Sequence, residues 1–449
     1  MNKKNVIVAG AGFAGIAAAL SAARNDADVI LIERYGFLGG MATAGLVHHL
    51  DPVRLIEVTG IAWELFNEME KRGAIKEFKV DDVGMPFSFW QGGCSFDPEV
   101  LKLLSIELLE KAKIEILLHS WVGDVIKQGE KVTGVVVYNK SGRQEIYGNI
   151  IIDATGDADL AAAAGVPFEL GDENGECMSP TLCFRIAGVD MKKLYRYLDE
   201  NPDQIGNHPR LGKYIKEHRK SIVLQGFYDL IAQAKEAGDL TINLPETGIG
   251  MSLQPREGEF HVNATRVTDI NPLDIQDLTK AELIERKNIK QLFNFMKKYI
   301  PGFKHSYIIQ TAAQVGIRES RRIKGEYTYT IDDIKENRKF EDAVVRSKWA
   351  HTDVHSGKNM QWSFELIEGP YYIPYRAMVP KKVDNLLVAG RCISATRKAM
   401  ASIRIMPVCA SIGEAVGAAA AIASKKELTP RSVDIEELKT ILKRQGFKL

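Results

Sequence analysis

The sequence predicts an α/β fold in which a Rossmann-like, three-layer (ββα-type) nucleotide-binding domain is joined to a second α+β domain that caps it. Residues 5–34 follow the order strand, glycine-rich turn, helix and strand, which is typical of a dinucleotide-binding unit. Near the other end of the chain, an apolar strand at 386–389 precedes a helix rich in Ala and Gly. The 449 residues exceed what one simple core holds, and a second domain is therefore expected.

A G-x-G-x-x-G array stands between an apolar strand at 6–8 and a helix predicted over 13–24. We expect Gly10 to allow a tight turn, Gly12 to let the backbone approach a pyrophosphate, and Gly15 to let helix and strand pack closely. The helix N-terminus adds free N–H groups and the positive end of a helix dipole. The array therefore favours a dinucleotide site over a strand–helix turn without a ligand.

An acidic residue closes the second strand of this unit. The strand is predicted over 29–32, and Glu33 follows it where dinucleotide-binding folds place the acid that contacts the ribose. We expect Glu33 to accept hydrogen bonds from the hydroxyls of an adenosine ribose.

The loop after this strand carries Gly39 and Gly40, followed by small residues at 41–45. Such a loop lets backbone lie flat against a large planar ligand, although a flexible glycine loop is the simpler alternative. His48 and His49 come next, and their closeness in the chain predicts that one of them lies near the ring that the loop touches. A surface histidine pair is the alternative.

The composition is that of an ordinary globular enzyme, with 45% hydrophobic and 26% charged residues. A net charge of +1 gives no global field that would favour nucleic acid or an anionic membrane. The five cysteines form no C-x-x-C pair, which argues against a metal centre and fits a reducing compartment. Lys3 and Lys4 imitate the start of a secretory signal, but the glycine spacing explains this segment better. We therefore expect a cytoplasmic protein with no metal.

Between the two ends of the nucleotide-binding unit, the chain alternates helices and strands. Segment 51–95 reads as an excursion with one amphipathic helix at 58–71. Asp97 and Pro98 predict the N-cap and first residue of a helix that runs to about residue 113. Further elements are predicted as a strand, a hairpin, a strand and a short helix, over residues 114–118, 132–147, 150–154 and 158–164.

The middle of the chain predicts strands at 181–187, 259–267 and 306–313, and a long charged helix at 274–299 that Pro301 ends. It contains no second G-x-G-x-x-G array, so a separate nicotinamide-nucleotide domain is not expected. We interpret this region as a cap that covers the bound nucleotide and builds the substrate site.

Two polar clusters stand out in this cap. Arg318, Arg321 and Arg322 fall within five positions, although such clusters are commonly solvated or salt-bridged. His351, Asp353 and His355 would lie on one side of an extended segment. No third ligand stands at helical spacing, so no metal site is predicted from these residues.

The C-terminal segment returns to the nucleotide-binding domain. Its strand at 386–389 ends in Gly390 and Arg391, and Pro407 suits the first position of the following helix. With the glycine fingerprint at the start and the Ala-Thr-Gly turn at 154–156, these motifs resemble the FAD-dependent oxidoreductases of the glutathione reductase superclass. The likeness is closer to the branch near the fumarate reductase and succinate dehydrogenase flavoproteins.

This resemblance implies a discontinuous FAD-binding domain built from residues 1–50, 96–170 and 371–449, with a substrate-binding cap at 171–370. It also implies that Val122 contacts adenine through its backbone, and that the helix beginning near Met406 points its N-terminus at the pyrimidine edge of the flavin. The expected cofactor contacts are Gly10, Gly12, Phe13, Ala14, Gly15, Glu33, Arg34, Gly39, Gly40, Met41, Ala42, Thr43, Val122, Ala154, Thr155, Gly156, Gly390, Arg391, Met406 and Pro407. The chain departs from the family at Arg397, where many members have a histidine.

The resulting functional hypothesis is an enzyme that moves a hydride between a small anionic substrate and N5 of non-covalently bound FAD. Non-covalent attachment is expected because the histidine pair follows the Gly39–Gly40 turn, whereas the covalent histidine of the fumarate reductase relatives precedes theirs. His48 or His355 would exchange the proton. The arginines expected to bind a substrate carboxylate are Arg318, Arg321, Arg376 and Arg404. The sequence names neither the substrate nor the electron partner.

Two alternatives remain open. An FAD-dependent monooxygenase of the same superclass would open with the same fingerprint, but such enzymes usually carry Gly-Asp where this chain has Gly390 and Arg391. A non-catalytic nucleotide-binding protein, or a tRNA-modifying branch of the fold, is the other, and the near-neutral charge argues against nucleic acid.

Overall fold

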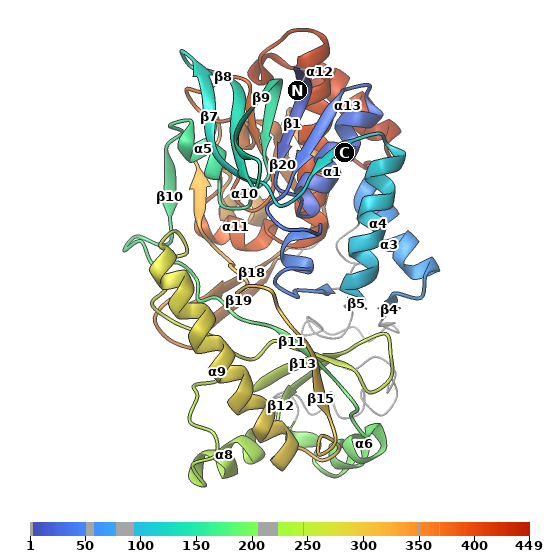
Figure 1. Ribbon diagram of the computed structural model, residues 1–449, viewed down its shortest axis with the longest axis vertical. Helices are drawn as coiled ribbons and strands as arrows, with labels where there is room; N and C mark the ends of the chain where they lie inside the picture. The colour runs from blue at the N-terminus through green and yellow to red at the C-terminus, as the bar shows by residue number, and fades with distance from the viewer. Residues whose placement is uncertain are drawn as a thin grey trace.

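A computed structural model describes residues 3–50, 58–77, 94–204, 223–245, 247–348, 350–367 and 369–449. The predicted α/β class is confirmed, because a mostly parallel sheet flanked by helices lies beside a second domain built on an antiparallel sheet (Figure 1). The two parts have separate hydrophobic cores. Most of the segment 51–95 that the sequence set apart as an excursion lies outside the described residues.

The central sheet has the strand order β6-β2-β1-β9-β8-β7, and β21 pairs with β9. The strands that pair in parallel are β1 (Lys4–Ala9), β2 (Val29–Ile32), β6 (Glu115–Leu117), β21 (Leu386–Val388) and the second half of β9 (Gly142–Asp153). The helices α1 (Phe13–Arg24) and α12 (Met406–Lys425) pack against β1, β2, β9 and β21, whose apolar runs are buried as in other parallel sheets. The carboxyl ends of the strands meet at one edge, where ligands bind in open α/β sheets.

The helices α1 and α12 also lie in close contact with each other. Glycines in α12 allow the contact: a Cβ added at Gly413 would stand 2.0 Å from the carbonyl oxygen of Ala14, and one at Gly417 would stand 2.2 Å from that of Ala18. Because both residue numbers rise by four from one contact to the next, the helices run in the same direction. Their N-termini therefore lie at the same edge of the sheet.

The helix α12 is also the one helix among the described residues that is long and apolar enough to cross a membrane, and 89% of its apolar window is buried inside the protein. It begins at Met406, so Pro407 is its second residue and not its first as expected.

An antiparallel meander extends the parallel sheet. The predicted hairpin is present between β8 (Lys131–Asn139) and β9. A further strand, β7 (Trp121–Gln128), pairs with β8 and is not among the predicted elements. The strands expected separately at 144–147 and 150–154 are one strand, β9. Its first half pairs with β8 and its second half with β1, so its polarity pattern changes midway.

The second domain is a five-stranded antiparallel sheet in the order β12-β13-β14-β11-β15, covered by the long helix α9 (Ile275–Tyr299) in the lower part of Figure 1. Asp274 caps this helix by accepting hydrogen bonds from the N–H groups of Gln276 and Asp277. The sheet strands are β11 (Phe184–Ala187), β12 (Val223–Gly226), β13 (Ile249–Leu253), β14 (Phe260–Val262) and β15 (Tyr307–Thr311).

Short sheets connect the two parts. These are β3 (His49–Leu50) with β4 (Ile75–Glu77) and β5 (Cys94–Phe96), β10 (Phe168–Leu170) with β16 (Arg321–Ile323), β17 (Ala343–Ser347) with β20 (Tyr371–Pro374), and β18 (Ala350–His355) with β19 (Trp362–Ile367). The other helices are α3 (Gly60–Lys71), α4 (Pro98–Lys111), α5 (Asp159–Ala163), α6 (Met191–Glu200), α8 (Tyr228–Glu236), α10 (Ile331–Lys335), α11 (Arg397–Ile403) and α13 (Ile435–Arg444). Asp97 caps α4 with Pro98 as its first residue, as predicted.

The contact between α1 and α12 yields a stability prediction. Gly417→Ala should lower the thermal midpoint, because a methyl group against the Ala18 carbonyl forces the helices apart at a cost of about 1–3 kcal/mol, more than the roughly 1 kcal/mol that Ala gains in helix propensity. Thermal unfolding followed by circular dichroism measures this. Lys425→Ala, at the exposed end of the same helix, is the control, and a midpoint at or above that of the wild type would contradict the packing argument.

Candidate cofactor and substrate site

A cavity lies at the carboxyl edge of the parallel sheet. Turns that follow β1, β2, β9 and β21 line it, together with the loop at 39–42 and the start of α12. Of the expected cofactor contacts, those that line it are Gly10, Gly12, Phe13, Ala14, Glu33, Arg34, Gly39, Gly40, Met41, Ala42, Val122, Ala154, Thr155, Gly156, Gly390, Arg391 and Met406.

Three of the expected contacts lie elsewhere. A Cβ on Gly15 would stand 1.8 Å from the Gly10 carbonyl oxygen, so this residue serves helix–strand packing. The Thr43 hydroxyl donates to the Leu38 carbonyl at 2.7 Å and closes the loop. Pro407 lines a second cavity.

The glycine turn leaves room for a ligand at one position. A Cβ at Gly12 would meet only the Cα of Gly40, at 3.8 Å, whereas one at Gly10 would collide with the Ala154 backbone. Gly12 is also the N-cap of α1, where no side chain caps the helix and no acid stands in the first turn. Uncapped N–H groups at a helix start favour an anion. This cradle fits the pyrophosphate of a dinucleotide.

Glu33 is buried at this edge, with 5% of its surface exposed. Its two carboxylate oxygens accept hydrogen bonds from the N–H groups of Ala11, at 2.7 Å, and Tyr35, at 3.0 Å. The carboxylate therefore ties the glycine turn to the end of β2, and each oxygen keeps a further lone pair for the ribose.

Two more carboxylates hold the turn after β9. Asp153 accepts from the Thr155 N–H and hydroxyl and from the Ala161 N–H, and burial raises its pKa to about 6. Asp157 forms an ion pair with Arg391, from the turn after β21. The Arg391 guanidinium beside it keeps the pKa of Asp157 low although burial alone would raise it. This pair fixes the two turns to each other across the cavity.

A second cavity adjoins the first, and both are lined by Met41, Ile317, Arg391, Arg404 and Met406. It lies between the start of α12 and the antiparallel sheet of the second domain. Its polar lining consists of His49, Thr181, Gln225, Thr247, Ser252, His261, Asn263, Arg266, Arg318, Asp353, His355 and Arg404.

Besides Arg391, three arginines line this second cavity, and two of these three are not ion-paired in the part of the chain that the structure describes. Arg318 donates to the Ser179 carbonyl and the Thr181 hydroxyl, both at 2.8 Å. Arg266 has its Nε and one Nη buried without a hydrogen-bond partner. Burial, and then the neighbouring Arg318, lower the pKa of Arg266 to about 9. Two cations that repel each other in this way favour an anionic ligand between them.

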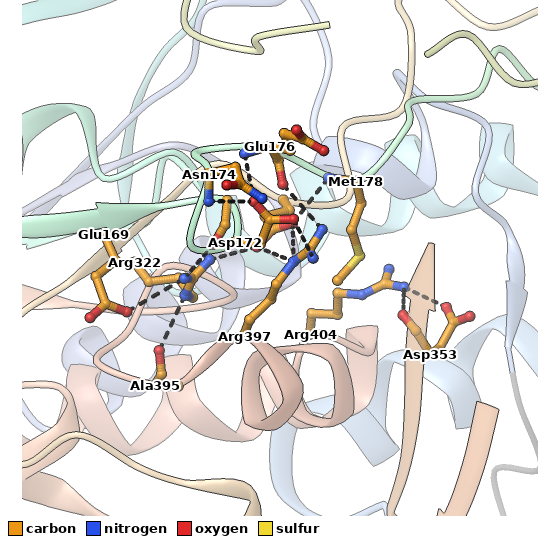
Figure 2. Close-up of polar contacts among 12 residues, drawn as sticks. Glu169, Asp172, Asn174, Glu176, Met178, Arg322, Asp353, Ala395, Arg397 and Arg404 are labelled. Carbon is orange, nitrogen blue, oxygen red and sulfur yellow. Dashed lines mark hydrogen bonds and ion pairs between the residues drawn. The ribbon is translucent and has the colours of Figure 1, made fainter. Parts of the chain in front are cut away.

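The third arginine, Arg404, forms an ion pair with Asp353 (Figure 2). Alternation along a strand predicts that His351, Asp353 and His355 share one side of it. Asp353 and His355 do meet on β18, at 2.9 Å between Oδ1 and Nε2, and Trp362 donates to the same oxygen at 2.6 Å. Burial lowers the pKa of His355 to about 3. The side chain of His351 lies outside the described residues.

Several expected site residues are placed elsewhere. His48, expected to exchange a proton, lines neither cavity: its ring is buried, and Nδ1 bonds the Leu46 carbonyl at 2.8 Å. The reason is the alternation of an extended segment, which turns Val47 and His49 to the second cavity and His48 away from it. His49 thus takes the place that His48 was expected to hold.

The remaining expected arginines are ion-paired away from the cavities. Arg321 bonds Asp159, and Arg376 bonds Asp342. Arg397, the departure that the family resemblance singled out, contacts Glu319, Asp172 and the Glu176 carbonyl (Figure 2). Arg397 therefore fastens the loop at 172–178 to the start of α11.

Comparison with known proteins agrees with this geometry. A family model described as FAD dependent oxidoreductase matches residues 5–442, while no curated protein matches. A solved geranylgeranyl bacteriochlorophyll reductase-like protein from Thermoplasma acidophilum is similar at 14% identity and a TM-score of 0.50, over 99% of this chain and 82% of that one. The myxobacterial chondrochloren halogenase CndH is similar at 13% identity and a TM-score of 0.48, over 99% and 79%.

A third structure, p-nitrophenol 4-monooxygenase from Pseudomonas putida, is similar at 10% identity and a TM-score of 0.46, over 98% and 80%. At these identities the likeness shows the fold alone. None of the three belongs to the fumarate reductase branch, so the closer branch likeness stays a prediction while the broader family resemblance is confirmed.

The position of Glu33 yields a prediction for FAD affinity. Glu33→Ala should weaken FAD binding by about 10- to 100-fold, since charge-assisted hydrogen bonds of about 1.5–3 kcal/mol are lost. It should also lower the stability of the FAD-free protein, because the Ala11 and Tyr35 N–H groups lose their acceptor. Fluorescence titration of the FAD-free protein measures the affinity. Glu110→Ala, an exposed carboxylate on α4, is the control, and an unchanged FAD affinity in a folded Glu33→Ala variant would remove Glu33 from the site.

Proposed function

The chain belongs to the family of FAD-dependent oxidoreductases, and from that premise we propose that it transfers a hydride between a small anionic organic substrate in the second cavity and N5 of FAD in the first. FAD supplies the hydride-transfer chemistry when bound. The choice of substrate rests on one observation. Arg266 and Arg318, which lie next to residues that both cavities share, have no ion-pair partner among the residues that the structure describes.

The residues that would hold the cofactor follow from the first cavity. The uncapped start of α1 would bind the pyrophosphate, and Glu33 the ribose hydroxyls. Met406 at the start of α12 lies where the two cavities meet, and this helix N-terminus also lacks a side-chain cap or an acid in its first turn. A helix N-terminus there favours negative charge on the ring that it faces. We propose that FAD is held without a covalent bond.

The second cavity would bind and orient the substrate. Arg266 and Arg318 can clamp a carboxylate in bidentate fashion, which fixes its orientation as well as its charge. Asp353 neutralises Arg404 and holds His355 and Trp362 in place along one wall. The wall therefore presents a polar but charge-balanced surface opposite the two free cations. This arrangement favours a substrate with one anionic group at the arginine pair.

A monooxygenase of the same superclass is the alternative reaction. Reduction of the flavin by a substrate without oxygen, followed by product analysis with and without oxygen, separates the two: the proposed enzyme bleaches its flavin anaerobically and leaves no oxygen atom in the product. We also propose a cytoplasmic location, which the four buried free cysteines at 177, 183, 392 and 409 support.

The arginine pair yields a prediction for anion binding. Arg318→Met and Arg266→Met should each weaken binding of a carboxylate probe by about 10- to 100-fold, because one charged partner of about 1.5–3 kcal/mol is removed. Acetate, benzoate and succinate, titrated against the flavin absorbance of the FAD-loaded protein, are the probes. Arg376→Met, which removes an arginine outside both cavities, is the matched control. Equal affinities in all three variants would refute the anionic-substrate proposal.

Arg404 yields a prediction for the flavin potential. Arg404→Met should lower the two-electron reduction potential, by about 20 mV for each 1 kcal/mol of stabilisation lost, because a cation at the junction of the two cavities is removed. It should also raise KM, since the negative charge of Asp353 in the substrate cavity is no longer balanced by Arg404.

The double variant Arg404→Met/Asp353→Asn tests the role of charge balance. It removes the carboxylate charge as well, so KM and the potential should both return towards the wild-type values if the lost charge balance causes both changes. Spectroelectrochemical titration measures the potential. A loss of thermal stability alone, with potential and KM at wild-type values, would show that the Arg404–Asp353 pair is only structural.

A further inference from the structure

Four polar side chains, three of them buried, form a hydrogen-bonded chain beside the second cavity. His49 Nδ1 and Ser95 Oγ are 3.3 Å apart, Ser95 Oγ donates to Ser252 Oγ at 3.2 Å, and Ser252 Oγ and His261 Nδ1 are 3.4 Å apart. Both histidines line the cavity. The chain therefore begins and ends at the space where the substrate would bind.

The fold builds this chain from two cross-strand pairs. His49 on β3 lies opposite Ser95 on β5, and Ser252 on β13 lies opposite His261 on β14. The two serine hydroxyls join the pairs, so the chain crosses from the small sheet of the first part to the antiparallel sheet of the second. Ser95, Ser252 and His261 are almost fully buried, which keeps bulk water from competing for these bonds.

The hydrogen bonds give the chain a direction. Since Ser95 donates to Ser252, the hydroxyl of Ser252 is left to donate to Nδ1 of His261, and Nδ1 of His49 must donate to Ser95. His261 then carries its own proton on Nε2, a buried nitrogen for which the described residues offer no partner within hydrogen-bond geometry. Because His261 lies in the cavity wall, a group of the bound substrate can be the partner of this nitrogen.

We propose that His261 exchanges a proton with the substrate and that Ser252, Ser95 and His49 relay this proton. The proposal rests on the proposed hydride transfer, which needs a proton to be taken up or released beside it. When the substrate is reduced, it receives a hydride from the flavin and the Nε2 proton of His261. The Ser252 proton then moves to His261 Nδ1, the Ser95 proton to Ser252, and the His49 Nδ1 proton to Ser95. His49 Nε2, a buried atom in the wall of the second cavity, takes up a proton from water that enters this cavity.

The chain holds the same number of protons before and after this sequence, and substrate oxidation runs it in reverse. Concerted transfer also avoids a buried imidazolium, which the surroundings disfavour: burial lowers the pKa of His49 to about 4, and burial with the charges of His48, His49 and Arg185 holds that of His261 far below its usual range. A histidine that passes its proton on need not carry the charge.

The other histidines of the region do not have this geometry. His48 packs against His261, with ring centroids 4.5 Å apart, but its Nδ1 is bonded to the Leu46 carbonyl and it lines neither cavity. It positions the ring of His261. The hydrogen bond of His355 goes to Asp353, and no relay continues from there, because the oxygens of Asp353 accept from Arg404 and Trp362 as well.

The test that needs no substrate is nitrogen-15 NMR of the FAD-loaded protein labelled at histidine. At pH 7 we expect both histidines neutral and in opposite tautomers, with His49 protonated on Nδ1 and His261 on Nε2. His49→Gln and His261→Gln assign the signals. The relay is overturned if either ring is charged at pH 7 or if both rings hold the proton on the same nitrogen.

The kinetic test uses a compound that the anaerobic screen shows to reduce the flavin. Ser252→Ala should slow flavin reduction by about 100-fold with little change in KM, abolish the multiple-proton solvent isotope effect and shift the pH profile, since a proton-transfer route is lost. Ser252→Thr keeps the hydroxyl and should restore the rate. Ser105→Ala, which removes a buried hydroxyl on α4, controls for the general effect of such a loss.

A wild-type rate and isotope effect in Ser252→Ala would refute the relay even where the substrate is correct. If no compound reduces the flavin, the proposed hydride transfer fails, and the tautomer measurement still decides whether the chain has the direction that the structure assigns. The two proposals therefore fail by different observations.

Discussion

The close parallel packing of α1 and α12 is the constraint on which the site depends. Gly413 and Gly417 bring the two backbones so near that no side chain fits between them, and their contacts with Ala14 and Ala18 set both helices in the same direction. Two helix N-termini, at Gly12 and Ile405, are thereby aimed at one cavity without side-chain caps. The N-terminus of α1 faces the expected pyrophosphate, and the N-terminus of α12 faces the junction with the substrate cavity. Because the packing contact aligns both helices, each end of the cofactor site has the positive potential of a helix N-terminus.

The acidic residues at the strand ends have structural as well as binding roles. Glu33 and Asp153 are buried at the edge of the sheet and Asp157 is half-buried there, and each accepts hydrogen bonds from backbone or ion-pairs across the cavity. A turn that must present its backbone to a ligand cannot rely on regular sheet hydrogen bonds, and these carboxylates supply the missing acceptors. Removing one therefore changes the shape of the cradle and not only its charge.

The sequence predicted the cofactor half of the site better than the substrate half. The glycine array, the turn at 154–156 and the Gly390–Arg391 pair each follow a strand of the same parallel sheet. Their position at its carboxyl edge can therefore be predicted from the local sequence alone. The arginines show the limit: Arg318 and Arg321 are neighbours, yet one lines the cavity and the other bonds Asp159. Arg266 and His261 lie in a segment without any charge cluster, and only the packing of the antiparallel sheet against α12 brings them to the cavity. No local pattern carries that information.

The two cavities divide the chemistry between the two parts of the chain. The sheet edge offers backbone N–H groups and Glu33, which suit a dinucleotide and do not depend on the substrate. The cap offers Arg266 and Arg318, and behind them the buried Glu285 on α9, whose pKa burial raises to about 7. Because that carboxyl is partly protonated near neutrality, it cancels only part of the charge of the two guanidinium groups, whereas Asp353 is paired directly with Arg404. The surplus positive charge therefore belongs to the cap alone, and a different substrate could be selected by changing cap residues without disturbing the cofactor cradle.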